Sequence, residues 1–276
     1  MNAAPRSNSS RATAITWNVS YSLSETVSPT VGVKAWEDRR DAVAAYVQPH
    51  DIVALQELSG RQFDDLAMLL PLHRPVAVKT PLPQVLVDAI RERFGSFEPH
   101  LIEIGMFLSE AFSVLEQGHC WLSPTPGIPL SIGYENVTPR QLLWVVACHR
   151  ASNRRVLIAT THIDWRSVRP MLRLVRERLK RAVADVGAGL LLGDLNTHTA
   201  PREIAGMLRD GWRDTHPTGR LDEDETYFGD LQGGPGRIDH VLVKGALRAE
   251  QWWRGTDVTA LGLSDHLAVG ASLLFD

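Results

Sequence analysis

Short apolar runs, each too brief to form a helix, recur along the chain and constrain its fold more than any other feature. In the first part, residues 12–17 and 52–55 have the character of strands, with a helix between them near 35–47. Further strands are predicted at 101–108, 112–115, 142–147, 156–161, 190–192, 238–243 and 267–274. Because helices separate some strands while others follow one another directly, parallel and antiparallel pairs are expected together. The pattern therefore predicts an α/β protein with a mixed sheet.

Proline and glycine mark the boundaries of the remaining helices. Residues 62–70 are expected to be helical up to Pro71, and residues 83–94 up to Gly95. Pro170 falls in the first turn of a further helix that carries an apolar stripe. Residues 1–12 are polar and predict a short disordered tail, so we expect a single domain over residues 13–276.

The composition is that of an ordinary globular protein, with 44% apolar and 22% charged residues in a chain of 276. No run approaches the roughly 20 apolar residues of a membrane-spanning helix, and the N-terminus lacks the apolar stretch of a secretory signal, so we expect a cytoplasmic protein. Cys120 and Cys148 are interpreted as reduced thiols, with pairing across neighbouring strands left open. The net charge of −3 gives no general attraction for nucleic acid, and the seven Lys or Arg residues from Arg166 to Arg181 indicate a solvated helix face.

Polar side chains capable of chemistry stand at the ends of the predicted strands. They are Asn18, Glu57, His162, Asp164, Asp194, Asn196, Asp239, Asp265 and His266. Taken singly, each has an ordinary explanation, since Asn and Asp at strand ends are most often turn residues that bond nearby backbone. Their recurrence at six separate strands is hard to explain as independent turns. The ends of strands are also where α/β sheets place their sites.

The residue types suit one kind of chemistry. Oxygen ligands without thiolates favour Mg²⁺, with Mn²⁺ or Ca²⁺ as alternatives, over zinc. Hydrolysis of a phosphoester needs a cation to neutralise the phosphate, a group that orients or deprotonates water, and donors to the developing charge. Carboxylates, amides and imidazoles supply all three, so the pattern indicates a divalent-metal-dependent phosphoester hydrolase.

Six blocks of sequence occur in a fixed order over nearly the whole chain. They are Thr16-Trp17-Asn18, Gln56-Glu57, Thr161-His162-Ile163-Asp164, Gly193-Asp194-Leu195-Asn196, Arg237-Ile238-Asp239-His240 and Ser264-Asp265-His266. Together they resemble the endonuclease/exonuclease/phosphatase superfamily, to which DNase I belongs. The resemblance implies a four-layered α/β sandwich with two packed mixed β-sheets and the site at one edge.

The resemblance also assigns roles. It implies Glu57 as the principal metal ligand, with Asn18 and Asp265 near the cation directly or through water. Asp194 would orient or deprotonate the attacking water, and Asn196 would help to hold this water and the phosphate.

Two imidazoles complete the implied catalytic set. His162 and His266 would contact the phosphate oxygens from opposite sides. Asp239 would hydrogen-bond His266, which fixes its tautomer and favours its charged form.

Three further residues are implied as supporting groups or phosphate contacts. Glu103 resembles the acidic partner that orients the first histidine, and Arg140 stands where the family often has an arginine facing the phosphate. Asp164 follows His162 in its block. The chain departs from the family pattern at Trp165, where a second histidine is common, and at His198, an additional imidazole near the predicted site.

The favoured function is hydrolysis of a nucleotide-like or other small phosphoester, because the site residues are complete and the chain lacks a clear basic groove. The alternative is an endo- or exonuclease acting on DNA or RNA. A catalytically inactive binding scaffold is the remote alternative, since such relatives typically lose a ligand or a histidine. Substrate selection is expected in the loops at 80–99, 125–139 and 215–235, while the oligomeric state stays open.

Overall fold

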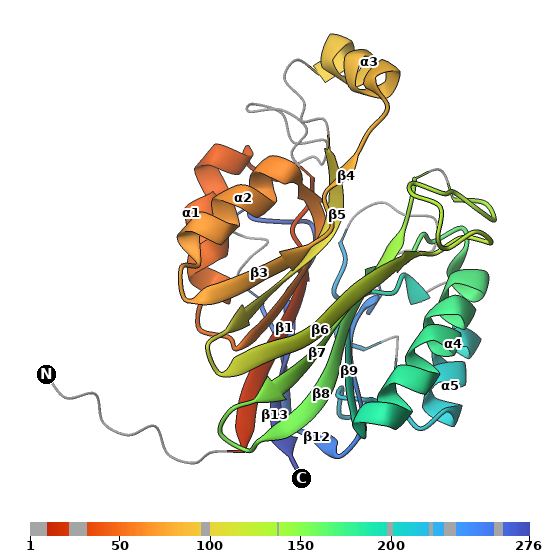
Figure 1. Cartoon of the computed structure of the whole chain (residues 1–276). Coiled ribbons are helices and arrows are strands. Elements are labelled where there is room, and N and C mark those ends of the chain that lie inside the picture. Colours follow the sequence, from red (N-terminus) through yellow and green to blue (C-terminus); the bar gives the residue numbers. More distant parts are fainter. Residues whose placement is uncertain are drawn as a thin grey trace, which may run out of the picture.

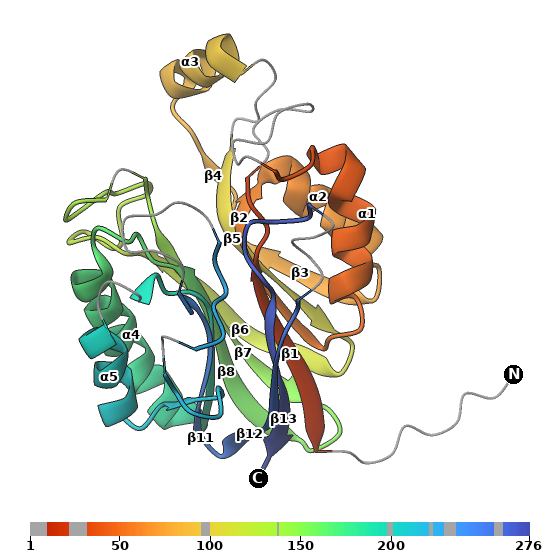
Figure 2. The same ribbon diagram turned by 180° about the vertical axis from the view of Figure 1, so that it is seen from behind.

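Two β-sheets pack face to face, and helices cover the outer face of each, so that four layers run across the molecule (Figure 1), as the view from behind also shows (Figure 2). The computed structural model describes residues 10–21, 32–94, 100–136, 138–197, 201–220, 223–228, 236–256 and 262–276. The arrangement confirms the predicted four-layered α/β sandwich with two mixed sheets.

The first sheet has seven strands, in the order β12-β13-β1-β2-β5-β3 with β4 paired to β5. Its strands are β1 (Arg11–Asn18), β2 (Ile52–Ser59), β3 (His73–Ala77), β4 (Thr80–Pro81), β5 (His100–Ser109), β12 (Leu247–Arg254) and β13 (Val269–Phe275). β1 and β2 are parallel and are connected by α1 (Trp36–Val47), whereas the other pairs are antiparallel.

The second sheet has six strands, in the order β10-β11-β9-β8-β7-β6. Its strands are β6 (Phe112–Trp121), β7 (Gln141–His149), β8 (Arg154–His162), β9 (Ala188–Asp194), β10 (Arg213–Asp214) and β11 (Asp239–Gly245). β8 and β9 are parallel and are connected by α4 (Val168–Val186). Within the described residues, each sheet thus contains one parallel strand–helix–strand unit, whose two strands end at the same edge of the sheet.

The helices lie on the outer faces of the sheets. α1 and α2 (Gly60–Leu69) cover the first sheet, and α4 and α5 (Pro201–Arg209) cover the second (Figure 1). Ser59 caps the N-terminus of α2, because its hydroxyl accepts from the backbone N–H of Gln62 at 3.1 Å in a reciprocal capping box. α3 (Gln84–Phe94) stands away from both sheets, beyond β4 (Figure 1).

Both faces of the central strands are buried, which explains their continuous apolar runs. In β1, Ala14 faces the opposite sheet, while Ile15 and Trp17 pack against α1 and α2. β9 alternates in the same way, with Leu190 between the sheets and Leu191 against α4. Truncation of such a buried leucine to alanine costs about 2–5 kcal/mol of stability.

A small polar group joins the sheets close to the strand ends. Gln56 of β2 donates from Nε2 to Oγ1 of Thr160 on β8 at 3.2 Å, and it accepts from Oγ1 of Thr16 on β1 at 3.2 Å. All three side chains are buried. Because a buried polar group requires a partner, this contact fixes how the two strand–helix–strand units lie relative to each other.

The expected N-terminal tail over residues 1–12 is too long and needs correction. β1 begins at Arg11, because Arg11 pairs with Leu274 of β13 and its Nε lies 2.7 Å from Oε2 of Glu250. Residues 1–9 lie outside the described part of the chain.

Other elements have no clear signal in the sequence. β3 carries Pro75, which an edge strand tolerates, and β12 is a half-exposed edge strand.

Cys120 and Cys148 are free thiols, as the favoured interpretation has it. None of the helices in the described ranges combines the length and apolar character needed to cross a lipid bilayer.

Candidate active site

Asn18, at the carboxyl end of β1, lies where the two sheets come together. Its Nδ2 donates to Oε1 of Glu57 on β2 at 3.1 Å and to Oδ2 of Asp194 on β9 at 3.2 Å. Its Oδ1 accepts from the backbone N–H of Ser20 at 3.0 Å, which fixes the orientation of the amide. One buried amide therefore joins the ends of three strands from both sheets.

Glu57 and Glu103 reach this edge because the pairing of β2 with β5 is irregular. The register shifts on either side of Leu58, and Glu57 and Glu103 have φ angles of 57° and 70°. Positive φ is costly for a residue with a Cβ, and a bulge turns side chains away from strict alternation. The strained backbone aims both carboxylates into the site.

His162, Asp194 and Asp239 are neighbours across the second sheet. In register, His162 of β8 pairs with Asp194 of β9, which pairs with Asp239 of β11. All three side chains are buried, and Nε2 of His162 lies 3.4 Å from Oδ2 of Asp194. Strand pairing alone thus places an imidazole and two carboxylates in a row.

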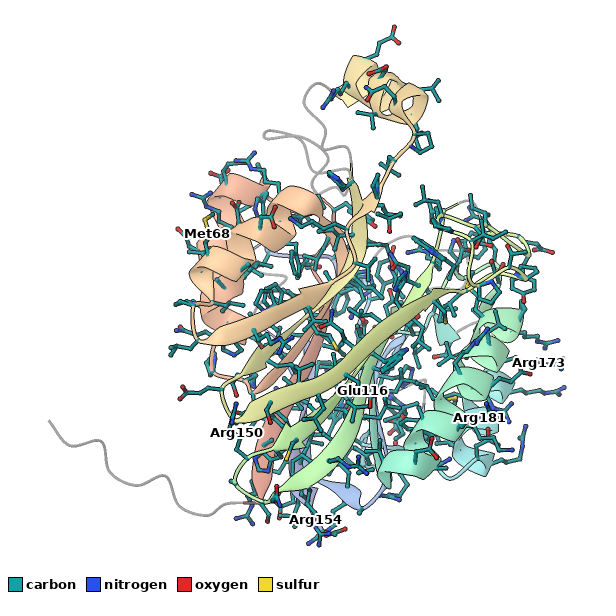
Figure 3. The ribbon with its side chains drawn as sticks, viewed as in Figure 1. Met68, Glu116, Arg150, Arg154, Arg173 and Arg181 are labelled. Atoms are coloured by element: carbon teal, nitrogen blue, oxygen red, sulfur yellow. The ribbon has the colours of Figure 1, made fainter. Side chains whose placement is uncertain are left out.

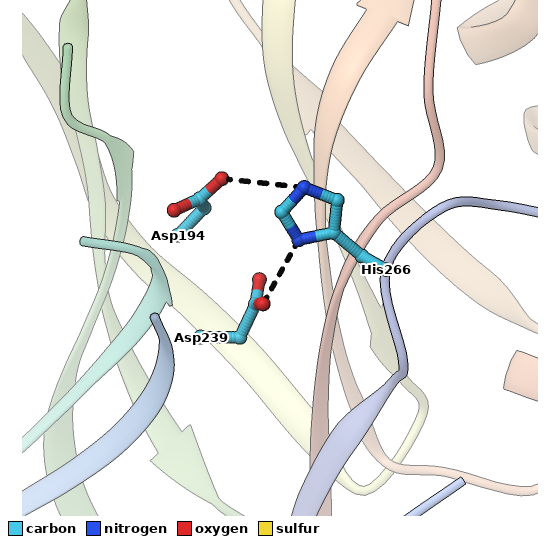
Figure 4. A group of neighbouring side chains, drawn as sticks. All are labelled: Asp194, Asp239 and His266. Atoms are coloured by element: carbon cyan, nitrogen blue, oxygen red, sulfur yellow. Dashed lines mark hydrogen bonds and ion pairs between the residues drawn. The ribbon is translucent and has the colours of Figure 1, made fainter. Parts of the chain in front are cut away.

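His266 lies between two carboxylates (Figure 4). Its Nδ1 is 2.9 Å from Oδ2 of Asp239, and its Nε2 is 3.8 Å from Oδ2 of Asp194. Oδ2 of Asp239 also accepts from Oγ1 of Thr226 at 2.7 Å. Burial would lower the pKa of His266, but the surrounding carboxylates, Asp239 above all, raise this pKa to about 10. His266 is therefore a cation at neutral pH.

Asp194 has an unusually high pKa for a carboxyl group. Burial and the charge of Asp239 raise its pKa to about 6, although His162 opposes this. Its Oδ1 accepts from the backbone N–H of Asn196 at 3.0 Å, and Nδ2 of Asn196 donates to the carbonyl of Ile163 at 2.7 Å. A carboxylate held in this way is suited to take a proton from water near neutral pH.

Glu57 and Asp265 form a second acidic group on the side of the first sheet. Burial would raise the pKa of Glu57, but the imidazoles of His162 and His266 hold it below its usual value. Burial raises the pKa of Asp265, and the charge of Glu57 raises it further. Two carboxylates that repel each other make a hard oxygen donor set that fits a divalent cation. Asn18 meets this set through Nδ2, which donates to Glu57, while its amide oxygen is bound to the N–H of Ser20.

Glu103, Arg140 and His162 form a buried cluster beside this group. Oε1 of Glu103 lies 2.6 Å from Nη1 of Arg140 and 2.8 Å from Nδ1 of His162. Arg140 carries only donors, so its contact with Nδ1 of His162 at 2.7 Å competes with the Glu103 bond for that nitrogen. Among the described residues, Nε of Arg140 and Oε2 of Glu103 are buried without a hydrogen-bond partner. An anionic ligand would satisfy the unpartnered donor.

Asp164 is engaged mainly in a turn. Its Oδ1 accepts from the backbone N–H of Arg166 at 3.0 Å, and its carbonyl accepts from the N–H of Ser167 at 2.9 Å, just before α4. Its charge also acts on Arg140. The structure therefore places Asp164 near the cluster while giving its side chain a backbone bond.

Two residues near the site escape sequence reasoning. The backbone N–H of Tyr21 donates to Oε2 of Glu57 at 3.2 Å, and burial, assisted by the charge of Glu103, raises the pKa of Tyr21 well above 10. Arg39 is fully buried in α1. A signal exists for Arg39, because it follows Trp36 by three residues and so falls on the apolar face of that helix.

Within the described ranges, one group of at least three acidic, histidine or cysteine side chains has ligand atoms within 4.8 Å of one another: Asp194, Asp239 and His266. Oδ2 of Asp239 is already bound to Nδ1 of His266, so this group is better described as an acid–imidazole pair beside a carboxylate. The carboxylates of Glu57 and Asp265 offer oxygen atoms alone, which hard divalent cations prefer. His198 lies outside the described residues.

The sequence matches the profile described as the Endonuclease/Exonuclease/phosphatase family over residues 15–266. No curated protein gives a significant sequence match.

Solved structures with low sequence identity share the fold. An endonuclease/exonuclease/phosphatase from Bacteroides vulgatus has a TM-score of 0.78 at 20% identity, covering 96% of this chain and 99% of that chain. A mannosyl-6-phosphatase from Bacteroides thetaiotaomicron has a TM-score of 0.73 at 20% identity, covering 96% and 100%. D. rerio TDP2 complexed with a single-strand DNA product has a TM-score of 0.68 at 17% identity, covering 95% and 98%.

Proposed function

The chain belongs to the endonuclease/exonuclease/phosphatase family, and we propose that it is a divalent-metal-dependent phosphoester hydrolase in which water attacks phosphorus in line with the leaving oxygen. One observation carries the proposal. Asn18 Nδ2 lies 3.1 Å from Glu57 and 3.2 Å from Asp194, so an oxygen-ligand group and an acid–imidazole group meet at one buried edge. Metal-assisted hydrolysis needs both groups together.

Glu57 and Asp265 are the residues that would hold the cation through their carboxylates, and Asn18, whose Nδ2 donates to Glu57, would orient this ligand or reach the cation through water. We propose Mg²⁺, with Mn²⁺ or Ca²⁺ as alternatives, because the donor set contains only hard oxygen atoms. When bound, the cation supplies positive charge to the phosphate. The chain itself keeps Glu57 ionised, since the nearby imidazoles lower the pKa of this carboxyl.

Asp194 is the proposed general base. A pKa of about 6 leaves most of the carboxyl ionised at neutral pH, yet still basic enough to accept a proton from water. The N–H of Asn196 holds one carboxylate oxygen and the amide of Asn18 holds the other. The base is thus oriented before the substrate arrives, which removes part of the entropic barrier.

His162 and His266 are the proposed donors to the phosphate oxygens. Their Nε2 atoms lie 3.4 Å and 3.8 Å from Oδ2 of Asp194, so both face the position of the attacking water. Asp239 keeps His266 charged, and Glu103 orients His162 through Nδ1. Removal of either imidazole is expected to lower the rate on the order of 10²-fold or more, as for other preorganised donors.

Arg140 is the proposed contact to the substrate phosphate, with Asp164 in a supporting role. The buried Nε of Arg140 has no partner among the described residues. Glu103 holds the guanidinium by a bond of 2.6 Å to Nη1. A phosphate oxygen would satisfy Nε in the geometry that arginine favours.

We propose a small phosphoester, nucleotide-like esters included, as the substrate. A net charge of −3 supports this over a polyanion, and one fold neighbour is a mannosyl-6-phosphatase. The second candidate, a nuclease, is favoured by the outward arginines of α4, of which Arg173 and Arg181 point into solvent (Figure 3), and by the neighbour solved with single-strand DNA.

The test is Mg²⁺-dependent hydrolysis across a panel of plasmid DNA, single-stranded RNA, nucleotides, sugar phosphates and p-nitrophenyl mono- and diesters. Asp194→Asn is the blank. Asp210→Asn, the same change at a carboxylate bound to Arg176 away from the site, is the matched control. We expect EDTA to abolish turnover by the wild type and the control. Retention of EDTA-sensitive turnover by Asp194→Asn would contradict the proposal, and polynucleotide cleavage that falls steeply with salt would favour the nuclease.

A further inference from the structure

We infer that Arg39 is the positioning residue of the cation site, and that its guanidinium holds together the chain segments carrying Asn18 and Asp265. The inference rests on the proposed function, in which these two residues stand around a divalent cation. Arg39 acts through the backbone that it holds, at a distance from the reacting atoms.

The hydrogen bonds of Arg39 all go to backbone carbonyls. Nη1 donates to Val19 and Leu263, the latter at 2.8 Å. Nη2 donates to Ser20 at 2.7 Å, and Nε donates to Lys34 at 3.0 Å. One guanidinium thus joins three segments: the residues after β1, the residues before β13 and the residues leading into α1.

Single hydrogen bonds join the same segments in pairs. Oγ of Ser264 donates to the carbonyl of Asn18 at 2.6 Å, and the N–H of Lys34 donates to the carbonyl of Gly262 at 2.9 Å. Arg39 is the group that contacts all three segments at once. Arginine offers five donors in a planar fork, whereas lysine offers a single ammonium, so lysine cannot reproduce the arrangement.

The charge of Arg39 has a particular setting. The guanidinium is fully buried, and no carboxylate of the described residues lies within ion-pair distance of it. Burial lowers its pKa to about 10, against the charges of Asp265 and Glu57, so Arg39 stays charged at neutral pH. A buried charge without a direct partner is costly. Bonds to four backbone carbonyls compensate part of this cost.

The consequence is a cation site that exists before the cation binds. The spacing between the two segments is set by the guanidinium, which bonds to carbonyls on both of them. Groups behind a metal ligand typically change metal affinity by roughly 10- to 100-fold when they are removed. We expect Arg39→Lys to weaken cation binding by about tenfold or more on that basis.

The experiment is calorimetric titration of the whole chain with Mg²⁺ or Mn²⁺ in the absence of substrate. The variants are Arg39→Lys and the matched control Arg237→Lys. Arg237 is also fully buried, but it donates to the carbonyl of Arg220 and to Asp214 on the side of the second sheet. Both variants are expected to unfold at lower urea concentration. Weakened cation affinity is expected of Arg39→Lys alone.

A folded Arg39→Lys variant with the cation affinity of the wild type overturns the inference. Should the variant fail to fold, amide exchange of the cation-free wild type decides. Slow exchange at residues 19–20 and 264–266 supports a preformed site, whereas fast exchange that slows only after cation is added overturns it. Absence of cation binding by the wild type would contradict both the inference and the proposed function. Cation binding by the wild type without hydrolysis of any ester would contradict the proposed function alone.

Discussion

Asp239→Asn is the most informative substitution at this site, because it removes one charge and almost no volume. Oδ2 of Asp239 lies 2.9 Å from Nδ1 of His266 and accepts from Oγ1 of Thr226 at 2.7 Å. An amide oxygen can still accept from Thr226. His266, however, loses the carboxylate that contributes most to its raised pKa.

The magnitude follows from the protonation of His266. Its pKa is raised from 6.5 to about 10 because the carboxylates outweigh burial, and the net effect favours the imidazolium by about 5 kcal/mol. Without Asp239, the remaining carboxylates Asp194 and Asp265 oppose burial. We expect the pKa of His266 to fall to about 6.5, the ordinary value for histidine, so that at pH 8 about 3% of the molecules carry the imidazolium. We expect a loss of about 30-fold from charge alone, and of 10²- to 10⁴-fold once the tautomer is also uncontrolled, on the order seen when an oriented imidazole loses its carboxylate.

The assay is kcat/KM for a p-nitrophenyl ester at pH 6 and pH 8, with the imidazole titrations followed by NMR. The loss relative to wild type is expected to be about 20-fold smaller at pH 6, where acid restores the charge of His266. Asp224→Asn is the control, because Asp224 lies 3.0 Å from Nε2 of His216 and its positive φ of 54° suits asparagine. Equal losses at both pH values, or a His266 that still titrates near 10 in the variant, would refute the reasoning.

Three further results are expected. In the wild type, kcat/KM rises with pH as Asp194 ionises, and the midpoint of this rise is expected at or below about pH 6, because a bound cation favours the charged carboxylate. Above about pH 10, kcat/KM falls as His266 loses its proton. A pH–rate profile measures both changes. Glu57→Gln abolishes the stabilisation by cation, which for the wild type is about 2.7 kcal/mol at 100 times Kd, as measured by thermal unfolding with and without Mg²⁺. Burial lowers the pKa of His50 and of His149, so their contribution to stability is present above about 6.5, the ordinary value for histidine, and is lost as pH falls below it; urea unfolding at pH 7.5 and 5.5 measures this loss.

The positions that sequence reasoning could predict are those set by strand pairing. His162 and Asp194 follow apolar runs that form parallel neighbours, and parallel strands end at one edge of a sheet. Asn18 follows the other parallel pair in the same way. For such residues, the local pattern and the tertiary position have a single cause, because a strand that packs apolar side chains on both faces carries its polar groups at its end.

The positions that could not be predicted depend on irregular backbone or on long-range contacts. The bulge that turns Glu57 and Glu103 into the site arises from the pairing of β2 with β5, strands far apart in the sequence. No local sequence pattern predicts this bulge. Arg39 donates to a carbonyl 224 residues away, a contact that neither periodicity nor charge pattern encodes, although its place on an apolar face indicates burial.

The edge strands could not be predicted from the sequence for a different reason. The side chains of β12 are mostly exposed or half-buried, and β3 includes Pro75. Such strands bury one face or less and so lack the apolar run by which central strands are recognised. A reading based on apolar runs therefore predicts the centre of each sheet, where the site lies, better than its margins.

The division of the site between the sheets links packing to catalysis. Glu57 and Asp265 belong to the first sheet and its adjoining segment, while Asp194 belongs to the second. The distance between the cation ligands and the proposed base is therefore set by how closely the sheets pack, through side chains as small as Ala14 and through the bond from Gln56 to Thr160. Overpacking of such an interface typically costs about 1–3 kcal/mol, which a folded protein tolerates. A displacement of about 1 Å at the reacting atoms can cost on the order of 10²-fold in rate, so changes between the sheets should reduce kcat well before they unfold the chain.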